Sequence, residues 1–338
     1  MSYNKVLENA RNCIGDYCKA CTECNGRVCR NTMPGPGAKG IGDTAIRNYD
    51  KWKEIRINMD TLTESKPIDM SIDLFGKKFK YPFFAGPVGA VNLHYGDKYN
   101  DVSYNNILVS ACANYGILAF TGDGVNPEVM KSATTSIKTV GGLGIPTIKP
   151  WNLDTIKEKM QLVKDSGAIA VAMDIDAAGL PFLQGRIPPA GRKSVEELKE
   201  IIDYAHVPFI VKGIMSVEGA QKAVDAGAKA IVVSNHGGRV LDGTPATACV
   251  LEEIADQFKG QVKIIVDGGI RSGLDVFKAL ALGADAVIIA RPFVNMIYGG
   301  KDEGVESYVQ QLGQELENTM MMTGVSSLRE ISKKNIYK

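Results

Sequence analysis

Residues 262–292 read VKIIVDGGIRSGLDVFKALALGADAVIIARP. Two apolar, β-branched runs, Val262–Gly269 and Ala286–Pro292, flank a stretch that starts at Ser272 and ends near Gly283. A serine just before a helix and a glycine just after it are common start and stop signals. The stretch therefore predicts a strand, a helix and a second strand. The continuous apolar character of both strands suits parallel strands that are buried on both faces.

The same unit recurs along the chain. Six earlier apolar runs are Phe83–Val88, Ile117–Thr121, Ile145–Lys149, Ala168–Ile175, Phe209–Ile214 and Ala230–His236. Amphipathic stretches with helix-start signals at Asn126, Ser194 and Ser216 lie between them. Eight buried strands that alternate with helices predict an α/β protein with a (β/α)8 (TIM) barrel. A doubly wound sheet is the alternative, but it would need fewer parallel repeats.

The barrel accounts for residues 81–338, and residues 1–80 form a Cys-rich and loop segment ahead of it. Gly and Pro are frequent in residues 31–48, which we expect to be loop. The chain has 39 Lys and Arg against 38 Asp and Glu, a net charge of +1, which argues against a nucleic-acid partner. We find neither an apolar run of about 18 residues nor a secretory signal, so we expect a cytoplasmic enzyme without a membrane partner.

Five of the seven cysteines lie between positions 13 and 29. Four of these, Cys18, Cys21, Cys24 and Cys29, have the spacing C-x2-C-x2-C-x4-C, and four thiolates this close can bind zinc or an iron–sulfur cluster. The bacterial ferredoxin pattern differs in its last gap. A set of reduced thiols in a loop is the other interpretation, and the sequence leaves all three open. The isolated Cys112 and Cys249 are expected to be ordinary buried thiols.

Polar residues stand at the end of nearly every predicted strand. These are Thr121, Asp123, Lys149, Asp174, Asp176, Lys212, Ser234, His236, Arg239, Asp267, Arg271 and Arg291. In a TIM barrel the active site is built at the carboxyl ends of the strands. A buried strand has no structural reason to end in charge repeatedly, so these side chains predict a ligand site for a small anionic substrate.

The ends of the seventh and eighth strands predict a phosphate site, as is common in these barrels. Gly268 and Gly269 allow backbone N–H groups to approach an anion, and the helix that begins at Ser272 adds a favourable dipole. Arg271 and Arg291 add charge-assisted hydrogen bonds. A phosphorylated cofactor or substrate is therefore expected.

Lys212 and His236 are the candidates for chemistry. Lys212 ends an apolar run, where a lysine is costly unless it is paired. It is either salt-bridged to Asp174 or Asp267, a Schiff-base nucleophile, or a cation that holds an anionic cofactor. His236 is the one histidine at a strand end; we expect His94 and His206 to be ordinary residues of loops or helix ends.

The strings VVSNHGGRVLDGTPAT (232–247) and VDGGIRSGLDVFKALALGADAVIIARP (266–292) resemble the FMN-dependent 2-hydroxy-acid oxidase and dehydrogenase family. This family includes glycolate oxidase, lactate oxidase and flavocytochrome-type lactate dehydrogenases. The resemblance implies an oxidoreductase of class EC 1.1 that oxidises a lactate- or glycolate-like 2-hydroxy acid and passes a hydride to flavin N5. It also implies a homo-oligomer, commonly a tetramer.

The resemblance also implies a role for each matched residue. His236 would be the base, Asp174 its partner, Arg239 the ligand of the substrate carboxylate, and Lys212 the cation near the flavin N1–O2 edge. FMN would be bound by Gly86, Pro87, Val88, Thr121, Lys149, Lys212, Ser234, Asp267, Gly268, Gly269, Arg271, Ala290 and Arg291.

The sequence departs from the family in three places. Lys149-Pro150-Trp151 replaces Gln-Leu-Tyr after the third strand, and the Cys-rich segment replaces a Tyr-bearing one, so both substrate-binding tyrosines are missing. The family's second substrate arginine has Arg186 or Arg192 as its only candidates in the loop after the fourth strand. These departures keep a second reading open, in which another FMN-dependent barrel enzyme, an isomerase or an NAD(P)H-linked reductase, uses the same flavin site.

Overall fold

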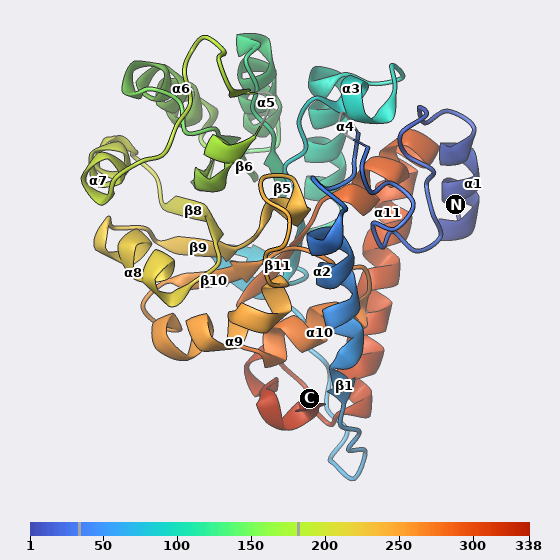
Figure 1. The fold of residues 1–338 in the computed structure, drawn as a ribbon. Helices are drawn as coiled ribbons and strands as arrows, with labels where there is room; N and C mark the ends of the chain where they lie inside the picture. Colours follow the sequence, from blue (N-terminus) through green and yellow to red (C-terminus); the bar gives the residue numbers. More distant parts are fainter. Residues whose placement is uncertain (33–34, 181–182) are drawn as a thin grey trace.

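The structure is a computed structural model that describes residues 1–32, 35–180 and 183–338. Its centre is a closed barrel of eight parallel strands (Figure 1). The strands are β4 (Phe83–Ala85), β5 (Ala119–Thr121), β6 (Gly144–Ile148), β7 (Val171–Asp174), β8 (Phe209–Ile214), β9 (Ala230–Val233), β10 (Lys263–Val266) and β11 (Ala286–Ile289). Each strand pairs with the next along the chain, and β11 pairs with β4 to close the ring. The predicted (β/α)8 barrel is confirmed.

Helices surround the strands and connect them. They are α3 (Val91–Tyr95), α4 (Asp101–Asn114), α5 (Pro127–Thr139), α6 (Leu153–Ser166), α7 (Val195–Tyr204), α8 (Val217–Asp225), α9 (Thr247–Phe258), α10 (Gly273–Ala281) and α11 (Arg291–Met322), which is interrupted at Lys301. The expected start signals are correct: Asn126, Ser194, Ser216 and Ser272 each accept a backbone N–H at the start of their helix. Every strand of the barrel is almost fully buried, as the apolar runs predicted.

Residues ahead of the barrel wrap around it (Figure 1). Helix α1 (Tyr3–Arg11) lies along α11, and α2 (Asp43–Glu54) packs against α9, α10 and the turn His236–Gly238. Two small antiparallel pairs complete the chain: β1 (Arg56–Ile57) with β12 (Ile336–Tyr337), and β2 (Ile72–Leu74) with β3 (Lys77–Phe79). Among the described residues, none of the helices combines the length and the apolar character needed to cross a membrane.

The predicted loop at 31–48 needs a correction, because residues 43–48 belong to α2. Met33 and Pro34 of that loop lie outside the described residues. The start of α2 is stabilised from a distance: the Asp242 carboxylate accepts the N–H groups of Ile41 and Thr44, at 3.0 and 2.9 Å. A cap that comes from a residue about 200 positions away leaves no local signal in the sequence.

Candidate active site

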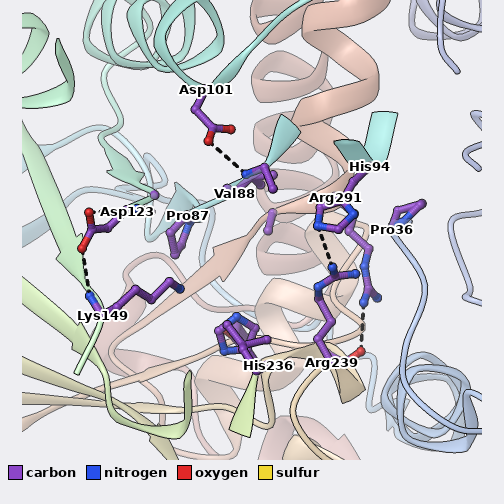
Figure 2. A pocket seen from close by; sticks show the side chains of 18 of the residues that line it. Pro36, Pro87, Val88, His94, Asp101, Asp123, Lys149, His236, Arg239 and Arg291 are labelled. Carbon is purple, nitrogen blue, oxygen red and sulfur yellow. Dashed lines mark hydrogen bonds between the residues drawn. The ribbon is translucent and has the colours of Figure 1, made fainter. Parts of the chain in front are cut away.

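The polar strand ends meet at one mouth of the barrel, around a cavity of about 300 Å³ (Figure 2). Volumes of this order are typical of small-molecule and cofactor sites. In the close view, His236 lies between Lys149 on one side and the two arginines Arg239 and Arg291 on the other. The cavity therefore has basic groups on both sides of His236, the histidine that follows strand β9.

Most of the predicted site residues line this cavity. They are Pro87, Val88, Lys149, Lys212, His236, Arg239, Asp267, Gly268, Gly269, Arg271, Ala290 and Arg291. The other four, Gly86, Thr121, Asp174 and Ser234, lie at the ends of β4, β5, β7 and β9 but are not part of the cavity surface. Neither Arg186 nor Arg192 lines the cavity, and both are exposed, so the structure supplies no second substrate arginine from that loop among its described residues.

The floor of the mouth is a buried ion-pair network centred on Asp174. Its carboxylate lies 2.6 Å from Lys149 Nζ and 2.9 Å from Lys212 Nζ, and Lys212 also lies 3.6 Å from Asp267. Burial alone would raise the pKa of Asp174, but the two lysines outweigh it and hold that pKa below its ordinary value. Burial likewise disfavours a charged Lys212, yet Asp174 and Asp267 raise its pKa above the ordinary value. Both groups are therefore charged at neutral pH.

His236 has a different partner from the one we expected. Its Nδ1 lies 3.0 Å from Asp176 Oδ1, so the predicted pairing with Asp174 is wrong. Asp174 forms ion pairs with Lys149 and Lys212 instead. The 3₁₀ turn Ile175–Gly179 follows β7 at once and directs Asp176 towards the histidine. Gly213 leaves room for this carboxylate, because a Cβ at Gly213 would lie 2.7 Å from Asp176 Cβ.

The backbone of His236 is in the left-handed region, with φ of 55°, which is uncommon for a residue other than glycine. The hydroxyl of Ser234 accepts the His236 N–H at 3.1 Å, and Gly237 and Gly238 continue the turn with positive φ. Strained backbone of this kind persists where the surrounding structure imposes it, often at functional sites. The S-N-H-G-G-R string thus builds a rigid turn that presents the imidazole, which is 16% exposed, at the cavity.

Arg239 is held by the N-terminal segment. Its Nη1 donates to the carbonyls of Gly35 and Gly37, at 2.7 and 2.8 Å, and its Nη2 lies 3.1 Å from His94 Nε2. His94 was expected to be an ordinary loop or helix-end residue, but it is buried and lines the cavity. Burial, and then the charge of Arg239, lowers the pKa of His94 to about 3, so this imidazole stays neutral at physiological pH.

The predicted phosphate end combines glycines, arginines and helix α2. A Cβ at Gly269 would lie 2.0 Å from the carbonyl oxygen of Asn48 in α2, so only glycine fits this contact. The indole of Trp52, also in α2, donates to the Gly268 carbonyl at 2.8 Å. Arg271 Nε donates to the carbonyl of Cys24 at 2.7 Å, and Arg291 Nη2 donates to that of Gly237 at 2.9 Å. Both arginines are thus held at the cavity wall by backbone oxygens.

The cysteines are not arranged around a single point. All seven are free thiols, and Cys249 is exposed, contrary to the expectation of a buried thiol. Over the described residues, metal-ligand atoms from three or more side chains come within 4.8 Å of one another only at Asp174, Asp176 and His236. Lys149 and Lys212 already neutralise that acidic group. The cysteines Cys18, Cys21, Cys24 and Cys29 instead line a second, smaller cavity beside the first.

Comparison with known proteins identifies the family. A family model described as FMN-dependent dehydrogenase matches residues 36–186 and 185–338. The chain belongs to this FMN-dependent dehydrogenase family. Glycolate oxidase 1 of Zea mays, for instance, is 30% identical over 344 residues, which cover 88% of this chain and 89% of that protein.

Other members of the FMN-dependent dehydrogenase family match more strongly over less of their length. An L-lactate dehydrogenase of Xanthomonas campestris is 48% identical over 41% of this chain and 36% of its own. A peroxisomal (S)-2-hydroxyacid oxidase of Arabidopsis thaliana is 44% identical over 43% of this chain and 39% of its own. Among solved structures, a lactate oxidase of Pediococcus acidilactici superimposes with a TM-score of 0.80 at 26% identity, covering 99% of this chain and 93% of that one.

The cavity fits the FMN that this family uses. Arg271 and Arg291 give one end the positive charge that a phosphate needs, and Pro87 and Val88 give an apolar wall. Asp267 also lines the cavity, and its buried Oδ1 is one of the described side-chain atoms that lack a hydrogen-bond partner. A buried polar group without a partner is costly, so a ligand that offers one is favoured there.

Sequence reasoning missed three contributors to the site. Asp176 was noted only as a strand-end acid, and its pairing with His236 depends on the turn after β7. His94 and the loop around Pro36 gave no local signal, because they reach the cavity only through the tertiary packing of α3 and the N-terminal segment. A motif search around His236 could have suggested a carboxylate partner but not which of the two carboxylates it is.

Proposed function

We propose that this chain is an FMN-dependent oxidoreductase that converts a small 2-hydroxy acid to the 2-oxo acid. The observation that carries the proposal is the His236–Asp176 pair, which lies at a cavity that also holds Arg239 and Lys212. A base, a cation for a carboxylate and a cation for an anionic cofactor are the groups that this oxidation needs. The names of the relatives, glycolate oxidase and lactate oxidase among them, support the same substrate class.

His236 acts as the base in this proposal. Its Nδ1 is engaged by Asp176, which leaves Nε2 to take the proton of the substrate hydroxyl. The Asp176 carboxylate then stabilises the imidazolium through a charge-assisted hydrogen bond. When bound, FMN supplies the acceptor for the hydride that leaves the α-carbon. The fixed turn around His236 places the base without any rearrangement.

Arg239 binds the substrate carboxylate in this proposal. Its Nη1 is fixed by the carbonyls of Gly35 and Gly37, so the guanidinium is oriented before the substrate arrives. The neutral His94 beside it adds a polar ring without a competing charge.

Lys212 and the two phosphate-end arginines hold FMN in this proposal. Lys212 is 3% exposed and charged, and it would place a positive charge beside the bound FMN. Arg271 and Arg291, with the N–H groups of Gly268 and Gly269, bind the phosphate. Lys149 replaces a neutral glutamine of the family, and its pairing with Asp174 keeps the net charge of the floor low.

Anaerobic bleaching of the bound flavin tests the function. The purified holoenzyme is mixed with a panel of 2-hydroxy acids (glycolate, L-lactate, mandelate and longer aliphatic acids), and flavin absorbance is followed. Rapid bleaching by at least one acid, lost in His236→Ala, is the expected result. Bleaching by NADH or NADPH with no response to any acid would overturn the proposal in favour of an NAD(P)H-linked reductase.

Oligomeric state and compartment stay predictions. We expect a homo-oligomer, and light scattering after size-exclusion chromatography measures its mass. We also expect a cytoplasmic enzyme, although the plant relatives named as hydroxyacid oxidases are peroxisomal. Cell fractionation followed by immunodetection distinguishes the two compartments.

A further inference from the structure

Residues 12–42, between α1 and α2, are held to the barrel in an unusual way. Over the described part of this stretch there is neither a helix nor a strand, and its fully buried apolar side chains are small ones, Ala20 and Ala38. A stretch of this length without regular structure or its own apolar core normally needs a covalent or metal cross-link to be ordered. The free thiols of the stretch are the groups that can supply one.

Four of the five thiols line one small cavity, and the fifth does not. Cys18, Cys21, Cys24 and Cys29 line the second cavity, together with Asn295, Tyr95 and Arg291 of the barrel. Cys13 lies apart from them: its Sγ donates to the carbonyl of Tyr298 at 3.1 Å and lies 3.2 Å from Lys98 Nζ. The structure therefore separates the C-x2-C-x2-C-x4-C set from the one cysteine outside the pattern.

The spacing of the four sulfurs favours a cluster over a single ion. Zinc–sulfur bonds of about 2.3 Å in a tetrahedron place the sulfurs about 3.8 Å apart. No three cysteine sulfurs in the described chain come within 4.8 Å of one another, so the thiols are not gathered as tightly as a tetrahedral zinc site requires. An iron–sulfur cluster is wider than one ion and also takes four cysteines, and ligands at Cys18, Cys21 and Cys24 repeat every third residue as in ferredoxin-type loops.

The cysteine cavity adjoins the proposed flavin site. Pro36, Tyr95 and Arg291 line both cavities. The backbone of the thiol loop also contacts the phosphate end directly, because the Cys24 carbonyl accepts from Arg271 at 2.7 Å. Cys29 is also packed tightly against the segment beside Pro36, since a Cβ at Gly37 would lie 1.8 Å from the Cys29 carbonyl oxygen. A group bound by the four thiols would thus be separated from the first cavity by the width of a side chain.

We propose that Cys18, Cys21, Cys24 and Cys29 hold an iron–sulfur cluster that takes the electrons released by substrate oxidation. The cluster accepts the two electrons that the substrate has left on the cofactor, one at a time. It passes each electron to a one-electron carrier protein, so two carriers are reduced for each hydroxy acid oxidised. The two protons, one from His236 and one that came with the hydride, go to solvent. The electron route rests on the proposed function, because the substrate acid is the electron donor. The assignment of the four cysteines as cluster ligands does not depend on it.

Metal analysis of the full chain, purified without oxygen, tests the cluster. We expect iron and acid-labile sulfide in the wild type, and their loss in Cys18→Ser and in Cys24→Ser. The matched control is Cys13→Ser, which should keep both. Circular dichroism and bound flavin show that each variant is folded. Zinc in place of iron, no metal even after incubation with ferrous iron and sulfide, or equal loss in Cys13→Ser would each overturn the proposal.

Electron paramagnetic resonance then tests the electron route. Anaerobic addition of a substrate acid should produce the signal of a reduced cluster in the wild type. In His236→Ala the acid should produce none, while dithionite still does. If the acid bleaches the flavin but leaves the cluster oxidised, the route is wrong and the proposed function stands. If the acid affects neither centre while dithionite reduces the cluster, the proposed function fails and the cluster stands.

Discussion

The barrel and the N-terminal segment both line the same cavity, but they reach it by different means. The barrel places Lys149, Asp174 and Lys212 at the ends of adjacent parallel strands, each backed by a fully buried core. The N-terminal segment places Gly35 and Pro36 by hydrogen bonds and close backbone contacts, in the stretch 12–42, whose described part contributes only the small Ala20 and Ala38 to the buried hydrophobic core. One part of the site is thus built on stable elements and the other on polar contacts.

The two regions should therefore differ in how rigidly they hold their site residues. His236, the proposed base, and the ion pairs of the floor stand on the barrel, where positions hold to within small deviations because strands are fixed on both sides. The N-terminal segment covers Arg239, the proposed carboxylate ligand, and the end of the cavity proposed to bind the phosphate, and local opening costs less free energy there. Substitutions in the barrel should therefore affect rate or global stability strongly, and those in the segment should have smaller or condition-dependent effects.

The largest effect is expected at the base. His236→Ala should lower kcat by about 100-fold to 10,000-fold, because general-base catalysis is lost. Steady-state kinetics with the best substrate acid measures the change. The control is His206→Ala, since His206 is exposed and does not line the cavity. Equal kcat values for His236→Ala and the wild type would show that His236 is not the catalytic base.

The next effect concerns the floor of the barrel. Asp174→Asn leaves Lys149 and Lys212 without their shared carboxylate and should cost about 3–5 kcal/mol in free energy of unfolding. Urea unfolding at pH 7 measures it. Asp50→Asn is the matched control in α2, because the Asp50–Arg27 pair lies at the surface, where screening by solvent leaves an ion pair with little effect on stability. Similar losses in both variants would contradict the contrast between the two regions.

A pH-dependent effect is expected where the two regions meet, at His94. Its pKa is about 3 in the fold and 6.5 in a model peptide, so below pH 6.5 the unfolded chain binds a proton that the folded chain does not. The stability from this residue is complete above pH 6.5 and is lost towards pH 3, at about 1.4 kcal/mol per pH unit. In His94→Gln the free energy of unfolding should fall less steeply from pH 6.5 to pH 4.5. Parallel curves for the two proteins would show that His94 is not buried as a neutral group.

The smallest effect compares one helix cap from each region. Ser272 accepts the Asp275 N–H at 3.2 Å at the start of α10, and Ser272→Ala should cost about 1 kcal/mol. Ser2 accepts the Lys5 N–H at 3.4 Å at the exposed start of α1, and Ser2→Ala should cost less than about 0.5 kcal/mol. Thermal unfolding of the two variants measures the difference. A larger cost at Ser2 would mean that α1 stabilises the whole barrel.

Much of the fold could be read from the sequence because its signals are local. Continuous apolar runs gave all eight strands, and Ser272 or Asn126 marked where helices begin. The strand-end rule also brought Lys212, His236 and Arg239 to one cavity, since parallel strands end on the same side of a barrel. The loop predicted at 31–48 was partly wrong because its helix is capped by the distant Asp242.

Local signals in the sequence are enough to predict the barrel, the order of its strands and the residues that could reach the mouth, because period, turn signals and chain direction are properties of neighbouring residues. Which carboxylate pairs with which basic group depends on the tertiary fold. Asp174 and Asp176 are two positions apart, and the turn after β7, together with the space at Gly213, gives one to the lysines and the other to His236. The position of the four cysteines Cys18, Cys21, Cys24 and Cys29 next to the first cavity likewise depends on how residues 12–42 pack on the rest of the chain.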